Sequence, residues 1–271
     1  MGENMNKQEL IHQIKIWLKE AAEKIRAVQI KTLKVDQKTN RKDLVTNMDR
    51  EVQAFLIEKI QAYNPEAKIL AEEEGYSELE SFEGQVFVID PIDGTMNFVL
   101  EQENFCIMLG VYQDGVGQLG FIYDVMKEAL YWGGKDLGVY MNDHPLTKPE
   151  DLRLKDGLIG LNGYLFSHNR WNVRTIGEQS MGVRIYGCAG LEMIALLKGK
   201  HIGYIANLSP WDYGAGNVLL AEFGMKYSGI SGSGISGEKL KFRGREYYIA
   251  ATPQAYDEIR ALIAAADSLN K

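Results

Sequence analysis

Two aspartates stand three residues apart immediately after an apolar segment of this chain. The segment is partly β-branched, which predicts a buried strand that ends at Asp90, because Pro91 has no N–H to continue a ladder. If the strand delivers Asp90 and Asp93 to one point, their like charges face each other at a cost unless a cation lies between them. The following Gly94-Thr95 turn adds backbone N–H groups that suit a phosphate oxygen. Carboxylates for a metal beside amides for phosphate predict a metal-dependent phosphatase.

The same segment has an alternative interpretation as a surface turn. Its acids would then be solvated or would cap a helix. Two features favour a buried site instead: the segment follows a continuous apolar strand, and it runs on into Asn97-Phe98.

Further acids stand at the edges of other predicted elements. Glu72 and Glu73 follow a short apolar segment, and Asp212 lies near the start of a predicted helix. Taken singly, the first two are typical of a solvated loop, and Asp212 is typical of a plain helix cap. Together with Asp90 and Asp93 they supply the oxygen ligands that a hard divalent cation requires. The four histidines are scattered without zinc-type spacing, so Mg²⁺ or Mn²⁺ is expected rather than Zn²⁺.

The composition narrows the class of protein. The chain has 271 residues, 45% hydrophobic and 25% charged, which suits one compact globular unit with a large core. A net charge of −7 without a basic stripe argues against nucleic acid or a membrane as partner, and favours a small-molecule phosphate ester once cations are bound. There is no run of 18 apolar residues and no apolar leader, so a cytoplasmic location is expected. Cys106 and Cys188 show no metal or redox spacing and are expected to be small core hydrophobes rather than a disulfide.

The order of elements predicts two subdomains within one compact unit. An N-terminal α+β subdomain, residues 1–147, places two helices beside an antiparallel sheet and carries most of the metal ligands. A C-terminal α/β subdomain, residues 148–271, alternates strands and helices and forms the substrate side with Asp212. Hairpin turns are expected at Asp114-Gly115 and Gly133-Gly134. The predicted strands are 68–71, 85–90, 105–112, 116–123, 129–132, 138–142, 158–162, 183–186, 202–206, 225–228 and 247–251, and the predicted helices are 10–28, 46–63, 190–198, 212–223 and 254–265.

These motifs, taken in chain order, resemble the inositol monophosphatase family of Mg²⁺-dependent, lithium-sensitive phosphatases. The resemblance covers nearly the whole chain, and the DPIDGT and WDxxA motifs in this order are highly specific. It implies a layered αβαβα sandwich of the type shared with fructose-1,6-bisphosphatase, and usually a homodimer. The residues that carry it are Lys38, the segment from Asp43 to Thr46, Asp49, Glu72, Glu73, the segment from Asp90 to Phe98, Arg184, Gly187, Cys188, Ala189, Trp211, Asp212 and Ala215.

The resemblance also implies how two to three Mg²⁺ ions, or Mn²⁺ in their place, would be held. The implied ligands of the first ion are Glu72, Asp90, Thr95 and the carbonyl oxygen of Ile92. The implied ligands of the second are Asp90, Asp93 and Asp212, and a weaker third ion leans on Glu72. Glu73 is expected to stand behind these ligands.

Roles in catalysis and substrate binding follow from the same resemblance. The residues with implied catalytic roles are Thr95, Asp49, Glu72 and Lys38, the last on a loop near the metals. The residues implied to contact the substrate are Asp93, Gly94, Thr95, Gly187, Cys188, Ala189 and Asp212. The expected reaction is attack by an activated water without a phosphoenzyme, with Thr95 and either Asp49 or Glu72 receiving the proton.

The substrate is less closely defined than the reaction. Myo-inositol monophosphate or a related sugar phosphate is expected. Inositol-specific members carry an acid seven residues before the aspartate of the WD motif, and here that position is Ile205, so strict inositol selectivity is in doubt. Broad or dual activity on NADP(H) 2′-phosphate, fructose 1,6-bisphosphate or 3′-phosphoadenosine 5′-phosphate stays open as an alternative.

Two rival classes complete the hypotheses. A haloacid-dehalogenase-type phosphatase also has an acid pair after a strand, but its spacing is D-x-D with a nucleophilic first aspartate, whereas the spacing here is D-x-x-D. A regulatory or binding module with a degenerate site would lack one of the metal acids. Here Glu72, Asp90, Asp93, Thr95 and Asp212 are all present.

Overall fold

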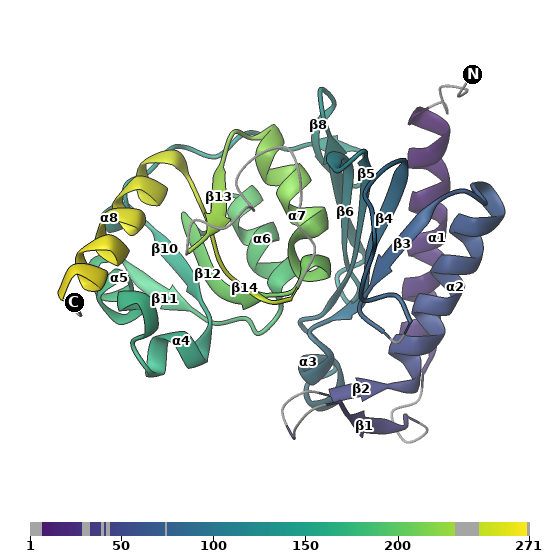
Figure 1. Ribbon diagram of the computed structural model, residues 1–271, viewed down its shortest axis with the longest axis horizontal. Helices are drawn as coiled ribbons and strands as arrows, with labels where there is room; N and C mark the ends of the chain where they lie inside the picture. The colour runs from purple at the N-terminus through teal and green to yellow at the C-terminus, as the bar shows by residue number, and fades with distance from the viewer. Residues whose placement is uncertain are drawn as a thin grey trace.

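The elements of the protein form five layers, helix–sheet–helix–sheet–helix, in the computed structural model (Figure 1). The structure describes residues 7–28, 33–38, 41, 44–73, 75–230 and 244–269. The expected αβαβα sandwich is therefore confirmed. Its first sheet ends at Pro145 and its second begins at Leu158.

Two long helices form the first layer. Helix α1 (Lys7–Ala27) buries one apolar stripe that includes Ile14 and Leu18, and helix α2 (Asn47–Tyr63) lies against it (Figure 1). The predicted capping box at the start of α2 is present. Thr46 Oγ1 accepts hydrogen bonds from the N–H groups of Met48 and Asp49, and Asp49 Oδ2 accepts one from Thr46 N at 2.8 Å. This box fixes the position of Asp49, which matters for the site below.

A seven-stranded sheet forms the second layer. Its strand order is β3-β4-β5-β6-β7-β8-β9, and every neighbouring pair is antiparallel except β3 and β4, which are parallel. The bounds are β3 (Lys68–Ala71), β4 (Gln85–Asp93), β5 (Cys106–Gln113), β6 (Val116–Asp124), β7 (Ala129–Gly134), β8 (Gly138–Met141) and β9 (His144–Pro145). A small hairpin of β1 (Val35–Gln37) and β2 (Leu44–Thr46), which the sequence pattern did not predict, precedes α2.

One of the two predicted hairpin turns is correct and the other is wrong. Asp114 and Gly115 have positive φ angles of 52° and 81° and join β5 to β6, as expected of a type I′ turn. Gly133 and Gly134 lie inside β7 instead. They are glycines because neighbouring backbone is too close for a side chain: a Cβ at Gly133 would collide with the carbonyl oxygen of Gly138, and one at Gly134 with that of Gln118.

The third layer consists of two helices between the sheets (Figure 1). Helix α6 (Ala189–Leu197) is buried along its length, and α7 (Pro210–Glu222) is buried from Tyr213 to Leu220. Helix α7 lies across β4, β5, β6 and β7 of the first sheet. Tyr112 donates a hydrogen bond from its hydroxyl to the carbonyl of Gly214 at 2.6 Å. A Cβ at Gly214 would lie 2.9 Å from Val88, so this glycine allows the close approach of α7 to the sheet.

A five-stranded mixed sheet and its outer helices complete the fold. The strand order is β11-β10-β12-β14-β13, with the first three parallel and the rest antiparallel. Its strands are β10 (Leu158–Leu161), β11 (Gly182–Arg184), β12 (Gly203–Leu208), β13 (Lys226–Gly229) and β14 (Glu246–Ala251). The outer helices are α4 (Gly163–Ser167), α5 (Val173–Gln179) and α8 (Pro253–Leu269), with single 3₁₀ turns at η2 (Leu154–Asp156) and η3 (Arg170–Asn172). Helices α4 and α5 were not predicted.

Candidate active site

Strand β4 carries both aspartates of the central motif. The prediction that it ends at Asp90 is wrong, because the pairing with β5 resumes at Asp93 after a register shift. The shift accommodates Pro91, whose missing N–H cannot take part in the ladder, and such irregularities commonly redirect side chains beside active sites. Asp90 and Asp93 are 1% and 7% exposed, which excludes the alternative of a solvated surface turn.

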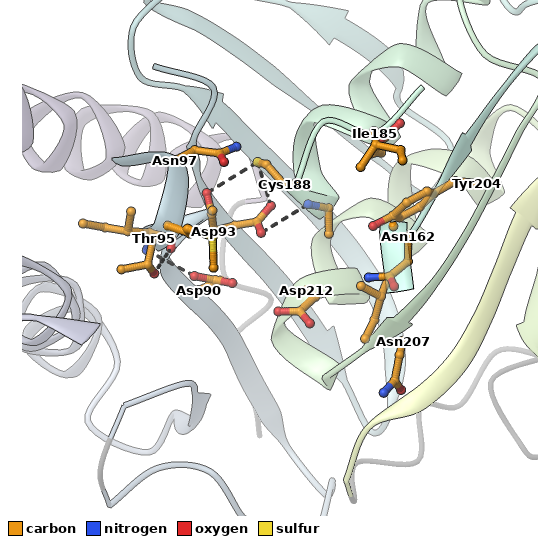
Figure 2. Close-up of a pocket in the computed structure, with 18 of the residues that line it drawn as sticks. Asp90, Asp93, Thr95, Asn97, Asn162, Ile185, Cys188, Tyr204, Asn207 and Asp212 are labelled. Atoms are coloured by element: carbon orange, nitrogen blue, oxygen red, sulfur yellow. Dashed lines mark hydrogen bonds between the residues drawn. The ribbon is translucent and has the colours of Figure 1, made fainter. Parts of the chain in front are cut away.

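Most of the predicted site residues line a single cavity of about 360 Å³ (Figure 2). The cavity lies between the first sheet and elements of the second half of the chain. The predicted residues that line it are Glu72, Asp90, Ile92, Asp93, Gly94, Thr95, Gly187, Cys188, Ala189 and Asp212. Three further predicted residues, Lys38, Asp49 and Glu73, stand behind this lining and contact it through the hydrogen bonds described below.

The aspartates in the cavity repel one another. Burial raises the pKa of Asp90 well above its ordinary value, and the nearby carboxylates of Glu72 and Asp93 raise it further. Burial and then the charges of Asp93 and Glu72 raise the pKa of Asp212 to about 8. Carboxylates in this state gain strongly from a bound cation, because it removes the cost of keeping them charged.

Asp93 lies at a junction of three elements. Its Oδ2 accepts hydrogen bonds from Gly190 N at 2.5 Å and from the thiol of Cys188 at 3.1 Å, and Cys106 Sγ lies 3.5 Å away. Its Oδ1 accepts from Ala189 N at 3.2 Å. Burial raises the pKa of Asp93, and these donors lower it in part. The start of α6 is therefore held against the end of β4 through one carboxylate.

Cys106 and Cys188 are more than small core hydrophobes. Both are buried and both are free thiols, as expected, but their sulfurs lie 3.7 Å apart and both face the carboxylate of Asp93. Burial raises the pKa of Cys188 to about 12 and that of Cys106 well above its ordinary value. Both side chains are therefore neutral thiols that can donate to Asp93. The two cysteines are 82 residues apart in the chain, so the sequence pattern could not predict that they are in contact.

Asp212 reaches the cavity from the first turn of α7 (Figure 2). Its Oδ2 accepts a hydrogen bond from Ser209 N at 2.7 Å, so it also acts as the helix cap that the sequence allowed. The two interpretations of this residue are thus compatible. One carboxylate oxygen holds the helix start while the side chain as a whole faces the acids of β4.

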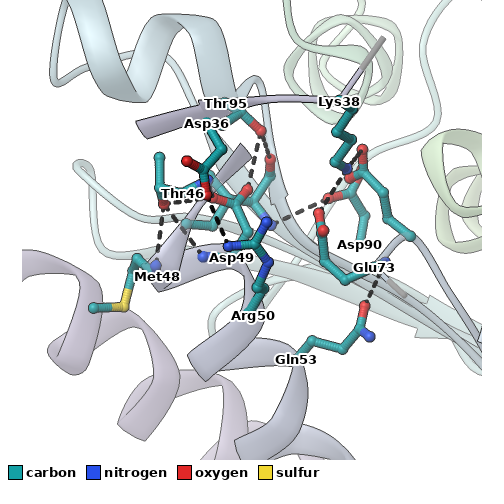
Figure 3. A network of polar contacts seen from close by, with 12 residues as sticks. Asp36, Lys38, Thr46, Met48, Asp49, Arg50, Gln53, Glu73, Asp90 and Thr95 are labelled. Atoms are coloured by element: carbon teal, nitrogen blue, oxygen red, sulfur yellow. Dashed lines mark hydrogen bonds and ion pairs between the residues drawn. The ribbon is translucent and has the colours of Figure 1, made fainter. Parts of the chain in front are cut away.

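Thr95 connects the cavity to the buried Asp49 (Figure 3). Its Oγ1 lies 3.1 Å from Asp49 Oδ1 and 3.0 Å from the carbonyl oxygen of Ile92, and its single proton can serve one of them at a time. Burial raises the pKa of Asp49 to about 6, although hydrogen bonds from Thr46 lower it. A carboxylate with this pKa can accept a proton near neutral pH.

Lys38 bridges the two glutamates that follow β3 (Figure 3). Its Nζ lies 2.8 Å from Glu72 Oε1 and 2.7 Å from Glu73 Oε1. Burial alone would lower the pKa of Lys38, but the two carboxylates raise it overall. Burial raises the pKa of Glu73 to about 6, and Gln53 Oε1 accepts a hydrogen bond from its backbone N–H at 2.8 Å. Lys38 thus supplies positive charge beside Glu72.

Polar residues of the second half that the sequence did not identify also line the cavity. Asn162 follows β10 directly and caps α4 through its Oδ1, which accepts from Tyr164 N at 3.0 Å. Asn207 and Arg245 line the same space, and Arg245 Nε donates to Ser209 Oγ at 3.3 Å. Asn162 was the last residue of the predicted strand 158–162, and a polar residue at a strand end was a usable signal. Arg245 carried none, because its neighbours in sequence do not form the site.

Ile205, the position at which inositol-specific members carry an acid, lies outside the cavity. Ile205 is fully buried in the apolar cluster of the second sheet, where it packs among Ile159 and Ile249. It does not line the cavity, whereas Asn207, two residues further along β12, does. Asn207, rather than Ile205, therefore faces the cavity from β12.

The geometry agrees with the comparison to known proteins. A model of the inositol monophosphatase family matches residues 6–269. The chain belongs to the inositol monophosphatase family. It is 36% identical over 250 residues to the inositol-1-monophosphatase of Bacillus subtilis, a match that covers 90% of this chain and 92% of that protein.

Solved structures of the inositol monophosphatase family have the same fold. A staphylococcal inositol monophosphatase I in complex with its products superposes with a TM-score of 0.86 at 27% identity, over 95% of each chain. A dual inositol monophosphatase/NADP phosphatase in complex with Mg²⁺ and phosphate superposes with a TM-score of 0.84 at 27% identity, over 94% of this chain and 95% of the other.

Membership of the inositol monophosphatase family decides between the classes considered for this chain. The protein is a phosphoric monoester hydrolase, and the haloacid-dehalogenase alternative is wrong. Among the residues that the structure describes, no helix is both long and apolar enough to span a membrane.

Proposed function

We propose that this inositol monophosphatase family member is a Mg²⁺-dependent phosphatase for a small phosphate monoester, namely myo-inositol monophosphate or a related sugar phosphate. One observation carries the proposal: acids from the end of β3, from β4 and from α7 line one cavity. The proposal is supported by a relative that is an inositol-1-monophosphatase and by a structural neighbour that binds Mg²⁺ and phosphate.

The donor set of the cavity fits a hard divalent cation. The ligand atoms are oxygens, which Mg²⁺ prefers. The pKa values of Asp90, Asp93 and Asp212 are raised, which indicates that nearby side chains do not supply enough positive charge to stabilise the three carboxylates. We assign Glu72, Asp90, Thr95 and the Ile92 carbonyl to one ion and Asp90, Asp93 and Asp212 to a second. A third ion near Glu72 and replacement by Mn²⁺ belong to the same proposal.

Bound divalent cations supply the positive charge that acidifies water and neutralises phosphate oxygens. The chain itself must then receive a proton and hold the ester. We assign proton transfer to the Thr95 hydroxyl and Asp49, since the two are in contact and Asp49 has a pKa of about 6. The backbone amides of Gly94 and Thr95 bind phosphate oxygens in this proposal. The backbone N–H of Ala189 already donates a hydrogen bond to Asp93, so in this proposal it orients Asp93 rather than binding phosphate directly.

A second candidate activity rests on Arg245. The cavity lining contains this guanidinium, whose charge acts on Asp212, together with the amides of Asn162 and Asn207. A guanidinium recognises a second phosphate better than it recognises a neutral sugar hydroxyl. This favours additional activity on a substrate with a second anionic group, such as fructose 1,6-bisphosphate or NADP(H).

The proposal is tested by phosphate release from a panel of esters. Myo-inositol 1-phosphate, fructose 1,6-bisphosphate, NADP and 3′-phosphoadenosine 5′-phosphate are compared by kcat/KM with Mg²⁺ and with a chelator. We expect turnover that depends on Mg²⁺ and is abolished by chelation. Turnover that persists in the chelator would refute the metal-dependent mechanism, and no turnover of any ester with Mg²⁺ would refute the substrate class.

A further inference from the structure

Three side chains beside the proposed magnesium ligands form a cluster of a different chemical kind. Asp93 and Cys106 are opposite partners in the β4–β5 ladder, and Cys188 approaches them from the residue before α6. The carboxylate of Asp93 and the two sulfurs all lie within 4.8 Å of one another. A side chain at Gly190 would collide with Cys106 Sγ, so the glycine lets α6 come close enough to bring Cys188 into the cluster.

The distances in this cluster match the edges of a zinc coordination tetrahedron. With Zn–S bonds of about 2.3 Å and Zn–O bonds of about 2.0 Å, tetrahedral angles put two sulfurs about 3.8 Å apart and a sulfur and an oxygen about 3.5 Å apart. The two sulfurs are 3.7 Å apart, and Asp93 Oδ2 is 3.5 Å from Cys106 Sγ and 3.1 Å from Cys188 Sγ. The three side chains thus nearly match three corners of the tetrahedron.

The donor types select a soft cation over Mg²⁺. Thiolates favour Zn²⁺ and Cd²⁺, whereas Mg²⁺ requires oxygen ligands. Asp93 and Cys188 both line the cavity, so a cation can reach the cluster from that side and a fourth ligand can come from there. The amides of Ala189 and Gly190 hold the carboxylate in its orientation, as outer partners do in established metal sites.

We propose that Asp93, Cys106 and Cys188 form a binding site for a thiophilic divalent cation of the Zn²⁺ type, and that occupation of this site inhibits the enzyme. Binding forms two metal–sulfur bonds and one metal–oxygen bond and releases the two thiol protons to solvent. Inhibition follows because Asp93 then serves the soft cation rather than Mg²⁺. This second part rests on the proposed function, whereas the binding itself does not.

The binding is tested with Co²⁺ and Cd²⁺, which report sulfur ligands by their charge-transfer absorption. The full chain, kept reduced by a phosphine, is titrated without Mg²⁺. We expect one ion per chain with sulfur-to-metal absorption. Cys106→Ser removes one of the two thiolates, so it should lower that absorption and weaken binding by more than about 100-fold, since even the loss of an outer partner costs roughly 10–100-fold. Cys106→Ala serves as a second variant, and thermal unfolding verifies that both are folded.

A matched control addresses adventitious binding at the surface. His168 is exposed and could capture the same ions, so His168→Ala should leave the sulfur absorption and the affinity unchanged. Sulfur absorption of wild-type intensity and affinity in both Cys106 variants would overturn the site, as would an affinity that depends on His168 instead.

The inhibitory part is tested by activity at saturating Mg²⁺, with each protein scored against its own uninhibited rate. We expect added Zn²⁺ to inhibit the wild type at a concentration more than about 100-fold lower than it inhibits Cys106→Ala, in line with the loss in binding. Equal sensitivity of the two would refute inhibition through this cluster. If the wild type shows no turnover at all, the phosphatase proposal fails, while the absorption titration still decides the binding site.

Discussion

Asp49 and Thr95 are 46 residues apart in the chain, yet Thr95 Oγ1 lies 3.1 Å from Asp49 Oδ1 at the edge of the cavity. The capping box of α2 fixes the other carboxylate oxygen, because Asp49 Oδ2 accepts from both the N–H and the hydroxyl of Thr46. Asp49 therefore caps a helix with one carboxylate oxygen and contacts Thr95 of the candidate active site with the other.

The first prediction concerns this contact. Thr95→Val keeps the shape of the side chain but removes the hydroxyl to which we assign proton transfer, so we expect kcat to fall by about 10²–10⁴-fold. Thr95→Ser restores the hydroxyl and should recover most of the rate. Steady-state phosphate release measures both variants. A valine variant with wild-type turnover would remove Thr95 from the mechanism.

The second prediction concerns Asp93. Asp93→Asn keeps an acceptor for the amide of Ala189 but loses the charge that a cation requires, so kcat should fall by about 10²–10³-fold while the thermal unfolding midpoint stays near wild type. Asp124→Asn is the matched control, since Asp124 is also buried but pairs with Lys127 outside the cavity. The idea fails if both variants keep full activity.

The third prediction is that the metal-free protein loses stability as pH rises. The folded-state pKa values of Asp212, about 8, and of Asp49 and Glu73, each about 6, lie above the ordinary values for carboxyl groups. The folded state therefore binds more protons than the unfolded state between about pH 4 and pH 8, and the free energy of unfolding falls across this window by up to about 1.4 kcal/mol per pH unit for each group that titrates.

This pH dependence is measured by urea unfolding in a chelator from pH 5 to pH 9. Asp212→Asn should flatten the slope above about pH 6, because the group with the highest of these three pKa values is gone. Saturating Mg²⁺ should also flatten it, since the cation stabilises the charged carboxylates. A metal-free stability that rises with pH over this range would contradict the electrostatic account of the site.

The fourth prediction concerns Lys38. Lys38→Met leaves the carboxylate of Glu73, only 4% exposed, without its cationic partner, and should lower the free energy of unfolding by about 1–3 kcal/mol. Arg50→Met disrupts an exposed ion pair with Asp36 and should cost less than about 1 kcal/mol. Adding Glu73→Gln to Lys38→Met should recover part of the loss. Equal effects of the two single substitutions would argue that burial of Glu73 is not the cause.

The fifth prediction concerns substrate preference. Arg245→Gln removes a guanidinium from the cavity wall and should lower kcat/KM for fructose 1,6-bisphosphate by roughly 10–100-fold more than for myo-inositol 1-phosphate, because the second phosphate loses a charged hydrogen bond. Arg153→Gln, on the exposed pair with Glu258, should leave the ratio unchanged. A ratio that does not respond to Arg245 would eliminate the second candidate activity.

Much of the fold could be predicted because its signals are local. The strands of the first sheet follow from their apolar patterns, and β3 has the predicted bounds. The capping box follows from a threonine, Thr46, three residues before an acid, Asp49. Errors arose where tertiary contacts outweigh local preference. Gly133 and Gly134 form a strand because close backbone neighbours require their small size, and β4 continues past Pro91 because pairing with β5 resumes at Asp93.

The acids of the candidate site could be predicted for the same reason, since each stands at the end of a recognisable element. Contacts between distant segments could not be predicted. The meeting of Cys106 with Cys188, and the exclusion of Ile205 from the cavity in favour of Asn207, depend on how two sheets pack against α6 and α7. The local sequence around these residues gives no information about that packing.

The layered arrangement places the proposed cation ligands and the residues that face the substrate from the second sheet on different walls of the cavity. Glu72, Asp90 and Asp93 belong to the first sheet, while Asn162, Asn207 and Arg245 come from the far sheet and its loops. Helix α7, which lies across the first sheet, keeps Asp212 with the former group. In the proposed mechanism, substitutions in the second wall change which ester is bound, while the acids that hold the cations stay unchanged in the first.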